Sequence, residues 1–483
     1  MPISRSRTLS RPGQKTSTKA RIRASSLLAI VLLVAAACSN STLPGGARVN
    51  AADQRSQLDA NGVAQPSNGT TPGAAGSLGA AGPLGAGGQT AAATGGESGA
   101  GGIQGVAATG GGASGSTVGI TDNEITISVS AAFSGVYGQL SNQLFDVAAT
   151  TWQKEVNSNG GIYGRQIKLV KVDNQGSADG AISACKEATS NGSFMVWNMT
   201  GAYVAEDACE DAAGMPVFDA NPSAMDPSWR SVIALTLGTQ FAPAEVSFVK
   251  SQYANAGNSK IGIIYTGDVA RYASQYDAVS AALLQAGLQL VHSEKISQNQ
   301  TSFVSQMSRM RDAGVQFVML YVGLEAPGII RDSQAIGYSP QYYAGPISGA
   351  ATDLGARSTG PLYNGVIGTR PFTTSETPAY AQFIANVRKY NGDSAAASAQ
   401  DFELPVYGAA VTIGKLLEVA GHDLTRESFV ASAKEVQDYD NGYLVPFTLK
   451  GKAIPVGQAA VFPIGCCQSD NTWKSLGPAG EQF

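Results

Sequence analysis

Between residues 124 and 173, the spacing of hydrophobic residues changes from that of a strand to that of a helix and back. Residues 125–130 are a β-branched run in which apolar residues alternate, which predicts a strand. Apolar residues over 140–156 recur at every third or fourth position, which predicts an amphipathic helix, and 167–172 form a second strand pattern. Strands joined through a helix run parallel, and parallel sheets bind ligands beyond the carboxyl ends of their strands. We therefore expect function in the loops that follow these two strands.

The same alternation of strand and helix patterns continues to the end of the chain. Residues 119–483 number 365, which is too many for one compact core and suits two lobes. The alternation predicts an α/β fold of two doubly wound parallel-sheet lobes. Further strands are predicted over 193–197, 215–218, 260–265, 288–292, 317–321 and 341–343, and further helices over 177–191, 203–213, 243–256, 272–286, 302–313, 326–336, 378–390 and 406–420.

Residues 1–37 have the pattern of a signal peptide. Residues 1–24 carry seven Lys or Arg and no acid, and the apolar segment that follows, 25–36, is too short to span a bilayer. Val34-Ala-Ala-Ala-Cys38 resembles a lipobox, in which the cysteine is lipidated and begins the mature chain, although Leu is commoner where Ala35 stands. The alternative is ordinary cleavage after the A-x-A motif that ends at Ala37. Both interpretations place the protein outside the cytoplasmic membrane, in the cell envelope, and the first gives it a lipid anchor in a membrane.

Residues 38–118 show no apolar periodicity. From Thr71 to Ser116 the chain has 17 Gly in 46 residues and a single charged residue, Glu97. Such a segment cannot bury enough apolar area to offset the entropy of ordering it. We expect residues 38–118 to be a disordered Gly/Ala-rich tether.

Removal of the signal peptide makes the chain strongly acidic. Without its seven basic residues, 25 of the 32 Lys and Arg remain against 36 Asp and Glu, a net charge near −11. This charge argues against nucleic acid and against an anionic membrane surface as partners.

Four cysteines remain if Cys38 carries lipid, and in an oxidising compartment they allow three pairings. Cys185 and Cys209 lie 24 residues apart, each inside a predicted helix, which suits a disulfide between successive helices on one face of a sheet. The adjacent Cys466 and Cys467 cannot pair without an unusual peptide geometry, so free thiols are equally compatible with the sequence. A zinc site is not expected, because no histidine or second cysteine pair is nearby, and the sequence suggests no cofactor.

Several segments of residues 119–483 combine into a recognisable pattern. They are Gly-Ile-Thr-Asp-Asn-Glu-Ile-Thr-Ile at 119–127, Ser-Gly at 134–135, Val-Asn-Ser-Asn-Gly-Gly-Ile-Tyr-Gly-Arg at 156–165, Lys-Leu-Val-Lys-Val-Asp at 168–173, Gly-Val-Gln-Phe-Val-Met-Leu at 314–320 and Gln-Ala-Ile-Gly-Tyr at 334–338. Together they resemble type 1 periplasmic binding proteins, and most of all the branched-chain amino acid receptors of ABC importers. The resemblance covers 119–483.

The resemblance implies two lobes joined by three crossing segments, with ligand held in the cleft between the lobes. Lobe one would contain residues 119–237 and 371–440, and lobe two would contain residues 238–370 and 441–483. The crossings would lie near 235–240, 367–371 and 439–446.

The resemblance also implies where the carboxylate of a ligand is held. Matching positions are Thr200 and Gly201 after one strand, and Asn221 and Ser223 after the next. Hydroxyls and unpaired N–H groups at a helix start favour an anion. Ordinary N-capping of a helix is the alternative role for these hydroxyls.

Ser134 and Tyr137 in the first loop, together with Tyr272 and Phe402, match positions that surround the ligand in the family. Aromatic walls supply contact area at low entropic cost, although ordinary packing would also explain Phe402.

One position departs from the family. Amino acid receptors usually supply an acid from lobe two to pair with the ammonium of the ligand, and the matching residues here are Ile347-Ser-Gly349. Asp353 and Glu325 are nearby acids, but neither aligns. A desolvated ammonium without a counter-charge is costly, so an amino acid ligand is in doubt.

The chain is not expected to be an enzyme. Its two histidines, His292 and His422, are far apart in sequence and fall in different predicted lobes, which argues against a Ser-His-Asp site. We expect a solute-binding lipoprotein that captures a small polar, carboxylate-bearing ligand, amino-acid-like or related, and hands it to an ABC importer permease. A ligand sensor for a membrane partner and a non-transport envelope docking protein are the alternatives.

Overall fold

The computed structural model describes residues 115–483 except 202, 253–258, 299, 459 and 468–469. The predicted signal peptide, Cys38 and almost all of the predicted tether lie outside the described residues. Within the described part, no helix is both long enough and apolar enough to cross a bilayer.

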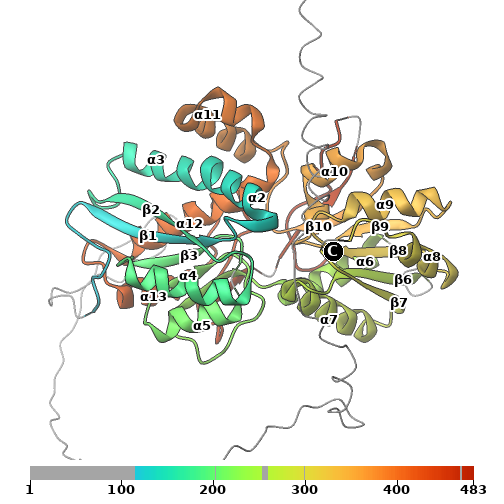
Figure 1. The fold of residues 1–483 in the computed structure, drawn as a ribbon, viewed down its shortest axis with the longest axis horizontal. Helices are drawn as coiled ribbons and strands as arrows, with labels where there is room; N and C mark the ends of the chain where they lie inside the picture. The colour runs from blue at the N-terminus through green and yellow to red at the C-terminus, as the bar shows by residue number, and fades with distance from the viewer. Residues whose placement is uncertain (1–114, 202, 253–258, 299, 459, 468–469) are drawn as a thin grey trace, which may run out of the picture. The chain divides into compact units, whose positions relative to one another are not determined.

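The first lobe is built on a sheet in which all paired strands are parallel (Figure 1). Its longest pair is β1 with β2, whose register runs without interruption from Glu124 opposite Gln166 to Ala131 opposite Asp173. Six described strands form this sheet, in the order β11-β5-β4-β3-β1-β2: β1 (Glu124–Ala131), β2 (Gln166–Asp173), β3 (Met195–Asn198), β4 (Val217–Asp219), β5 (Val232–Thr236) and β11 (Val456–Gln458).

Helices cover both faces of this sheet because its strands are apolar on both sides. Ile127 of β1 belongs to the core that contains Trp152 and Phe429, whereas Val172 and Val196 pack with Ala184 on the opposite face. The predicted helix over 140–156 is continuous but contains one π-helical turn, η2. The elements are η1 (Gly135–Tyr137), α2 (Gly138–Leu144), η2 (Phe145–Ala149), α3 (Thr150–Ser158), α4 (Ala178–Ser190), α5 (Val204–Ala212), α11 (Pro378–Ser398), η7 (Asp401–Glu403), α12 (Leu404–Ala420) and α13 (Arg426–Ala433).

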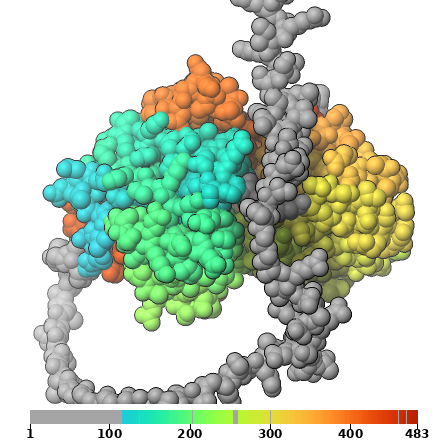
Figure 2. Space-filling model, viewed as in Figure 1, coloured from blue at the N-terminus to red at the C-terminus, as the bar shows by residue number. Residues whose placement is uncertain are grey.

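Segments distant in sequence complete the first lobe. Helix α11 packs against α3, and its orange surface lies against the blue-green surface of the first half of the lobe (Figure 2). The return of residues 378–434 to lobe one therefore follows the expectation from the family resemblance.

The second lobe has a mixed sheet whose two C-terminal strands are antiparallel. Alternate residues of the interior strand β8 (Phe317–Tyr321) face opposite layers of helices. Val318 packs with residues of α8 and α9, and Met319 packs with residues of α6 and α7. Seven described strands form this sheet, in the order β13-β12-β10-β9-β8-β6-β7: β6 (Lys260–Thr266), β7 (Gln289–Ile296), β8 (Phe317–Tyr321), β9 (Gln341–Ala344), β10 (Ile367–Arg370), β12 (Phe462–Gly465) and β13 (Lys474–Ser475). The helices of this lobe are η3 (Gly238–Phe241), α6 (Ala242–Gln252), α7 (Ala270–Gln285), α8 (Val304–Asp312), α9 (Ala326–Ala335), η5 (Gly349–Ala351), α10 (Asp353–Thr359) and η6 (Gly360–Tyr363).

The C-terminal tail differs from the expected arrangement. Residues 441–483 were expected in lobe two, yet β11 pairs with β5 in the first sheet, and only β12 and β13 join the second. The expected crossing near 439–446 is instead a local pairing of Tyr439 with Phe447. The chain crosses from the first sheet to the second for the last time between β11 and β12. A three-residue strand that contains a glycine has no apolar periodicity, so the sequence does not indicate which sheet it joins.

The four described cysteines form two pairs. Cys185 of α4 and Cys209 of α5 are joined by a disulfide, with their Cα atoms 6.2 Å apart. Cys466 and Cys467 are also joined, across a cis peptide bond.

Candidate ligand-binding site

Loops from the carboxyl ends of both sheets enclose a cavity of about 410 Å³. The first lobe contributes the loops after β1, β3 and β4, and the second lobe contributes the loops after β6 and β9. Ligands of parallel sheets bind at this edge, and the cavity is of a size that suits a small molecule.

Most of the residues proposed from the sequence line this cavity. They are Tyr137, Thr200, Gly201, Asn221, Ser223, Tyr272 and Phe402. Ser134 does not line it: its side chain is exposed, and its backbone N–H donates to Asp173 Oδ1 at 3.3 Å. The histidines lie elsewhere, His292 on β7 beside Glu294 and His422 after α12 beside Asp423.

Asp173 organises the loop that carries Tyr137. Its Oδ1 accepts hydrogen bonds from the backbone N–H groups of Phe133 at 2.9 Å and Gln175 at 2.8 Å. Burial would raise the pKa of this carboxyl, but hydrogen bonds from Ser134, Gln175 and Phe133 outweigh that effect and lower it. The last residue of β2 therefore fixes the loops after both β1 and β2.

The floor of the cavity is formed where the loops after β3 and β4 approach each other. Gly201 has φ +90°, and a Cβ at this position would collide with the carbonyl oxygen of Asn221. Only glycine therefore fits there. This close approach brings Thr200 and Ser223 to the same cavity.

Neither hydroxyl caps a helix, which corrects the expectation that both stand at helix starts. Helix α5 begins at Val204, and its N-cap is Tyr203, three residues beyond Thr200. No helix lies between β4 and β5 in the described residues, so Ser223 belongs to an irregular loop. Pro222 and Pro227 in that loop are unfavourable to a helix interior.

Buried acids lie beneath this floor. The carboxyl of Glu206 accepts from Asn174 Nδ2 at 3.2 Å, and the amide of Asn198 donates to Asp207 at 2.9 Å and to Glu210 at 3.1 Å. Burial raises the pKa of Glu206 to about 7 and raises the pKa values of Asp207 and Glu210 well above their ordinary range. Burial therefore disfavours the charged forms of these carboxyls. In the described part of the chain, no acidic, His or Cys group is arranged to hold a metal ion.

Tyr137 and Tyr272 face the cavity from opposite lobes. Tyr137 Oη donates to Gln298 Oε1 at 3.0 Å, which links the first lobe to the second. Burial, followed by the nearby Tyr272 and Glu325, raises the pKa of Tyr137 to about 12, so it stays neutral. Tyr272 is buried at the start of α7.

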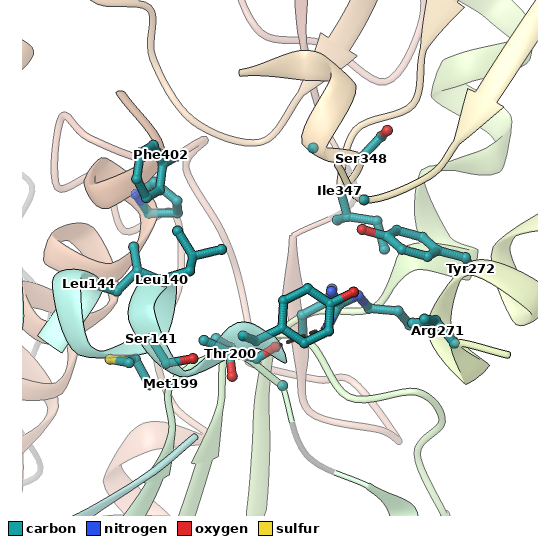
Figure 3. Close-up of a pocket in the computed structure, with 18 of the residues that line it drawn as sticks. Leu140, Ser141, Leu144, Met199, Thr200, Arg271, Tyr272, Ile347, Ser348 and Phe402 are labelled. Atoms are coloured by element: carbon teal, nitrogen blue, oxygen red, sulfur yellow. Dashed lines mark hydrogen bonds between the residues drawn. The ribbon is translucent and has the colours of Figure 1, made fainter. Parts of the chain in front are cut away.

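Phe402 both lines the cavity and packs on the core of the first lobe. Its neighbours hold it in place: Asp401 forms a buried ion pair with Arg370, and Glu403 accepts from Gln143 Nε2 at 2.8 Å. Leu140 and Leu144 of α2 stand on the same side of the cavity (Figure 3). This side is therefore an apolar wall.

Two charged residues of the second lobe line the cavity without having been identified from the sequence. Asp268 and Arg271 lie in the segment that leads from β6 into α7. A basic residue directly before the aromatic Tyr272 was the available signal. Ile347 and Ser348, from the segment that matches the acid of amino acid receptors, also line the cavity. Asp353 and Glu325 do not line it; Asp353 accepts instead from the backbone N–H of Trp473 at 2.9 Å.

A family model described as "Periplasmic binding protein" matches residues 124–464. The chain belongs to the periplasmic binding protein family. This confirms the resemblance inferred from the sequence. Proteins of this family bind solutes outside the cytoplasm and are not enzymes.

Curated relatives within the family are distant. Leu/Ile/Val-binding protein homolog 7 of Brucella abortus is 26% identical over 307 residues, which cover 59% of this chain and 75% of that protein. The leucine-, isoleucine-, valine-, threonine- and alanine-binding protein of Pseudomonas aeruginosa is 24% identical over 281 residues, 56% of this chain and 71% of that protein.

Solved structures confirm the fold. A branched-chain amino acid ABC transporter protein from Thermus thermophilus with bound valine superposes with a TM-score of 0.64 at 14% identity, covering 75% of this chain and 97% of its own. A fatty acid ABC transporter substrate-binding protein from Thermomonospora curvata gives a TM-score of 0.62 at 17% identity, covering 76% of this chain and 95% of its own. The predicted α/β class with two doubly wound lobes of the type 1 periplasmic binding protein fold is therefore correct.

Proposed function

We propose that this protein captures a small polar, carboxylate-bearing solute in the cavity between its lobes and delivers it to the permease of an ABC importer. The observation that carries the proposal is the placement of Thr200 and Ser223. They come from loops after adjacent parallel strands, reach one cavity and cap no helix. Hydroxyls that no helix end requires are free to donate to a ligand.

The relatives support a carboxylate ligand. The Pseudomonas protein is named for binding five amino acids, and the Thermus structure holds valine. The Thermomonospora structure is named for fatty acids. These ligands share a carboxylate and an apolar body, and differ in the presence of an ammonium group.

Calorimetric titration of the purified protein with amino acids, aliphatic and aromatic acids and their amides tests this function. We expect one carboxylate-bearing solute to bind per chain, with a dissociation constant on the order of 1 μM, or about −8 kcal/mol. Binding of uncharged solutes alone would contradict the carboxylate. The absence of binding across the whole panel would contradict solute capture.

We also propose that Cys38 carries a lipid that anchors the protein to a membrane outside the cytoplasm. The support is the signal-peptide pattern and the segment Val34–Cys38, which lie outside the described residues. Growth with a palmitate analogue should label the wild-type chain but not Cys38→Ala. Equal labelling of both would contradict the anchor.

A further inference from the structure

We propose that Arg271 receives the carboxylate of the ligand, and that the cavity selects carboxylic acids with an apolar body and no α-amino group. This inference rests on the proposed function, because it concerns the ligand class of the same cavity. It adds a cation from the second lobe to the hydroxyls of Thr200 and Ser223 from the first lobe, which the family resemblance does not indicate.

Arg271 is a cation of the cavity without a carboxylate partner. Its Nη1 donates to the backbone carbonyl of Thr200 at 3.2 Å, across the two lobes. Its Nε is buried and makes no hydrogen bond. Among the described residues, no carboxylate lies within ion-pair distance of its guanidinium, whereas the buried Arg370 is paired with Asp401. A desolvated cation without a counter-charge is costly, so an anion that enters the cavity gains a strong partner.

The surroundings of Arg271 keep it charged and oriented. Its guanidinium carbon lies 5.0 Å from the centre of the Tyr272 ring. Burial lowers the pKa of Arg271, but interactions with Tyr272, Tyr137 and Tyr203 outweigh that effect and raise it. The hydrogen bond to the Thr200 carbonyl joins Arg271 and Thr200 at the wall of the cavity, which both residues line. A carboxylate at this point would therefore meet Arg271 and Thr200 together.

The opposite side of the cavity is apolar. Figure 3 shows Phe402, Leu140 and Leu144 across the cavity from Arg271 and Tyr272. Met199 also lines the cavity and is 2% exposed. A ligand with a charged head and an apolar body fits this division, since each part meets a matching surface.

Among the described residues that line the cavity, no acid is buried. The buried Glu325, whose Oε2 has no hydrogen-bond partner, lies next to Gly323 but does not line the cavity. The segment Ile347-Ser-Gly349 is the one that, by the family resemblance, matches the place of the acid in amino acid receptors, and it lines the cavity. Ser348 Oγ donates to the carbonyl oxygen of Val322 at 2.7 Å. Asp268 lines the cavity, but it is exposed, and both its oxygens accept from the backbone N–H of Gln298, at 3.1 and 3.3 Å. Within the described lining, an ammonium would therefore be desolvated near the positive Arg271, and the acid that it could contact directly is the water-screened Asp268.

Calorimetry on the full-length protein with matched ligand pairs tests the inference. Leucine is compared with 4-methylpentanoate, and phenylalanine with 3-phenylpropanoate, so that the members of each pair differ only in the ammonium. We expect the acid without the amine to bind at least about 10-fold more tightly, from the desolvation of an unpaired ammonium. Tighter binding of leucine and phenylalanine than of their counterparts would overturn the inference.

Variants test the role of Arg271 itself. Arg271→Gln should weaken the binding of 4-methylpentanoate by roughly 10-fold to 100-fold, the range for loss of a charge-assisted hydrogen bond. It should leave the weak binding of the uncharged 4-methylpentanamide unchanged. Arg271→Lys should give an intermediate loss, because lysine keeps the charge but not the planar fork. A change of less than about 3-fold for the acid in Arg271→Gln would overturn the assignment.

Arg426→Gln is the matched control. Arg426 also donates to backbone carbonyls, those of Phe194 at 3.0 Å and Ser193 at 2.6 Å, but it lies outside the cavity. The Arg426→Gln variant should lower the stability of the protein, because these hydrogen bonds are lost, and leave the affinity for 4-methylpentanoate unchanged. If Arg271→Gln does not fold, Arg271→Lys and the ligand pairs on the wild type decide the question. Binding of amino acids alone refutes this inference and leaves solute capture standing, whereas no binding of any solute refutes both.

Discussion

Thr200 and Ser223 are the residues on which the proposed carboxylate site most directly depends. Replacing either by Ala should weaken ligand binding by roughly 10-fold to 100-fold, because each would remove a hydrogen bond to a charged, buried acceptor. The melting temperature of the unliganded protein should hardly change, since neither hydroxyl caps a helix. Calorimetric titration beside thermal melts measures both quantities.

Thr425→Ala provides the contrast at the same scale. Thr425 is a true N-cap, whose side chain accepts from the backbone N–H of Ser428 at the start of α13. Its replacement should cost about 1 kcal/mol of stability and leave affinity unchanged. Loss of stability without loss of affinity in Thr200→Ala and Ser223→Ala would reject the site.

At the scale of elements, the disulfide that joins α4 to α5 is the clearest source of local stability. The Cys185–Cys209 disulfide closes a loop with a sequence separation of 24. The double variant Cys185→Ser with Cys209→Ser should be less stable by roughly 3 kcal/mol, from the larger entropy of the unfolded chain. Denaturant unfolding measures this difference. Peptide mapping that finds both thiols free in protein from the envelope would contradict the bond.

Helix α6 carries a buried carboxyl that should make stability depend on pH. Glu245 is fully buried and accepts from Tyr321 Oη at 2.7 Å and Tyr343 Oη at 3.0 Å. Burial raises its pKa to about 7, despite these hydrogen bonds, which lower it. The pKa of Glu245 is therefore higher in the folded protein than in the unfolded chain. The stability that the protonated Glu245 contributes is fully present below about pH 4.5 and is lost as the pH rises through about 7.

Glu245→Gln should therefore flatten the pH profile of stability. From about pH 5 to about pH 8, the wild type should lose roughly 2–3 kcal/mol more than the variant, whose amide does not titrate. Urea unfolding at each pH measures the difference. The exposed Glu187→Gln on α4 is the control and should follow the wild type. Parallel profiles for wild type and Glu245→Gln would contradict the assignment.

At the scale of the whole molecule, Ser116 is hydrogen-bonded to the first lobe. The backbone N–H of Ser116 donates to Glu427 Oε2 at 2.8 Å, and its carbonyl accepts from Arg426 N–H at 2.9 Å. Limited proteolysis should therefore release a stable fragment that starts near Thr117, because the expected tether offers exposed, unpaired backbone. Mass spectrometry of the fragment gives the boundary. Resistance of residues 71–116 to protease would contradict the tether.

The order of elements could be predicted closely because it depends on local spacing. The strand pattern over 317–321 coincides with β8, and the helix pattern over 326–336 corresponds to α9. Five of the described strands were not predicted: β5, β10, β11, β12 and β13. All five are short and are recognised through the strands with which they pair, and crossings were expected near Leu235 at the end of β5 and near Ile367 at the start of β10. Pairing is a property of the folded sheet and leaves no period in a short segment.

The sequence by itself determined the α/β alternation, the family and seven of the described residues that line the cavity, because each rests on composition, local periodicity or a contiguous motif. Only the tertiary structure decided which side chains meet. Thr200 and Arg271 are separated by 71 positions and touch across two lobes, and Gly201 meets Asn221 because β3 and β4 are neighbours. Such encounters depend on strand order and on the passages between sheets, so an arginine that looks like an ordinary helix residue in the chain becomes the unpaired cation of a cavity.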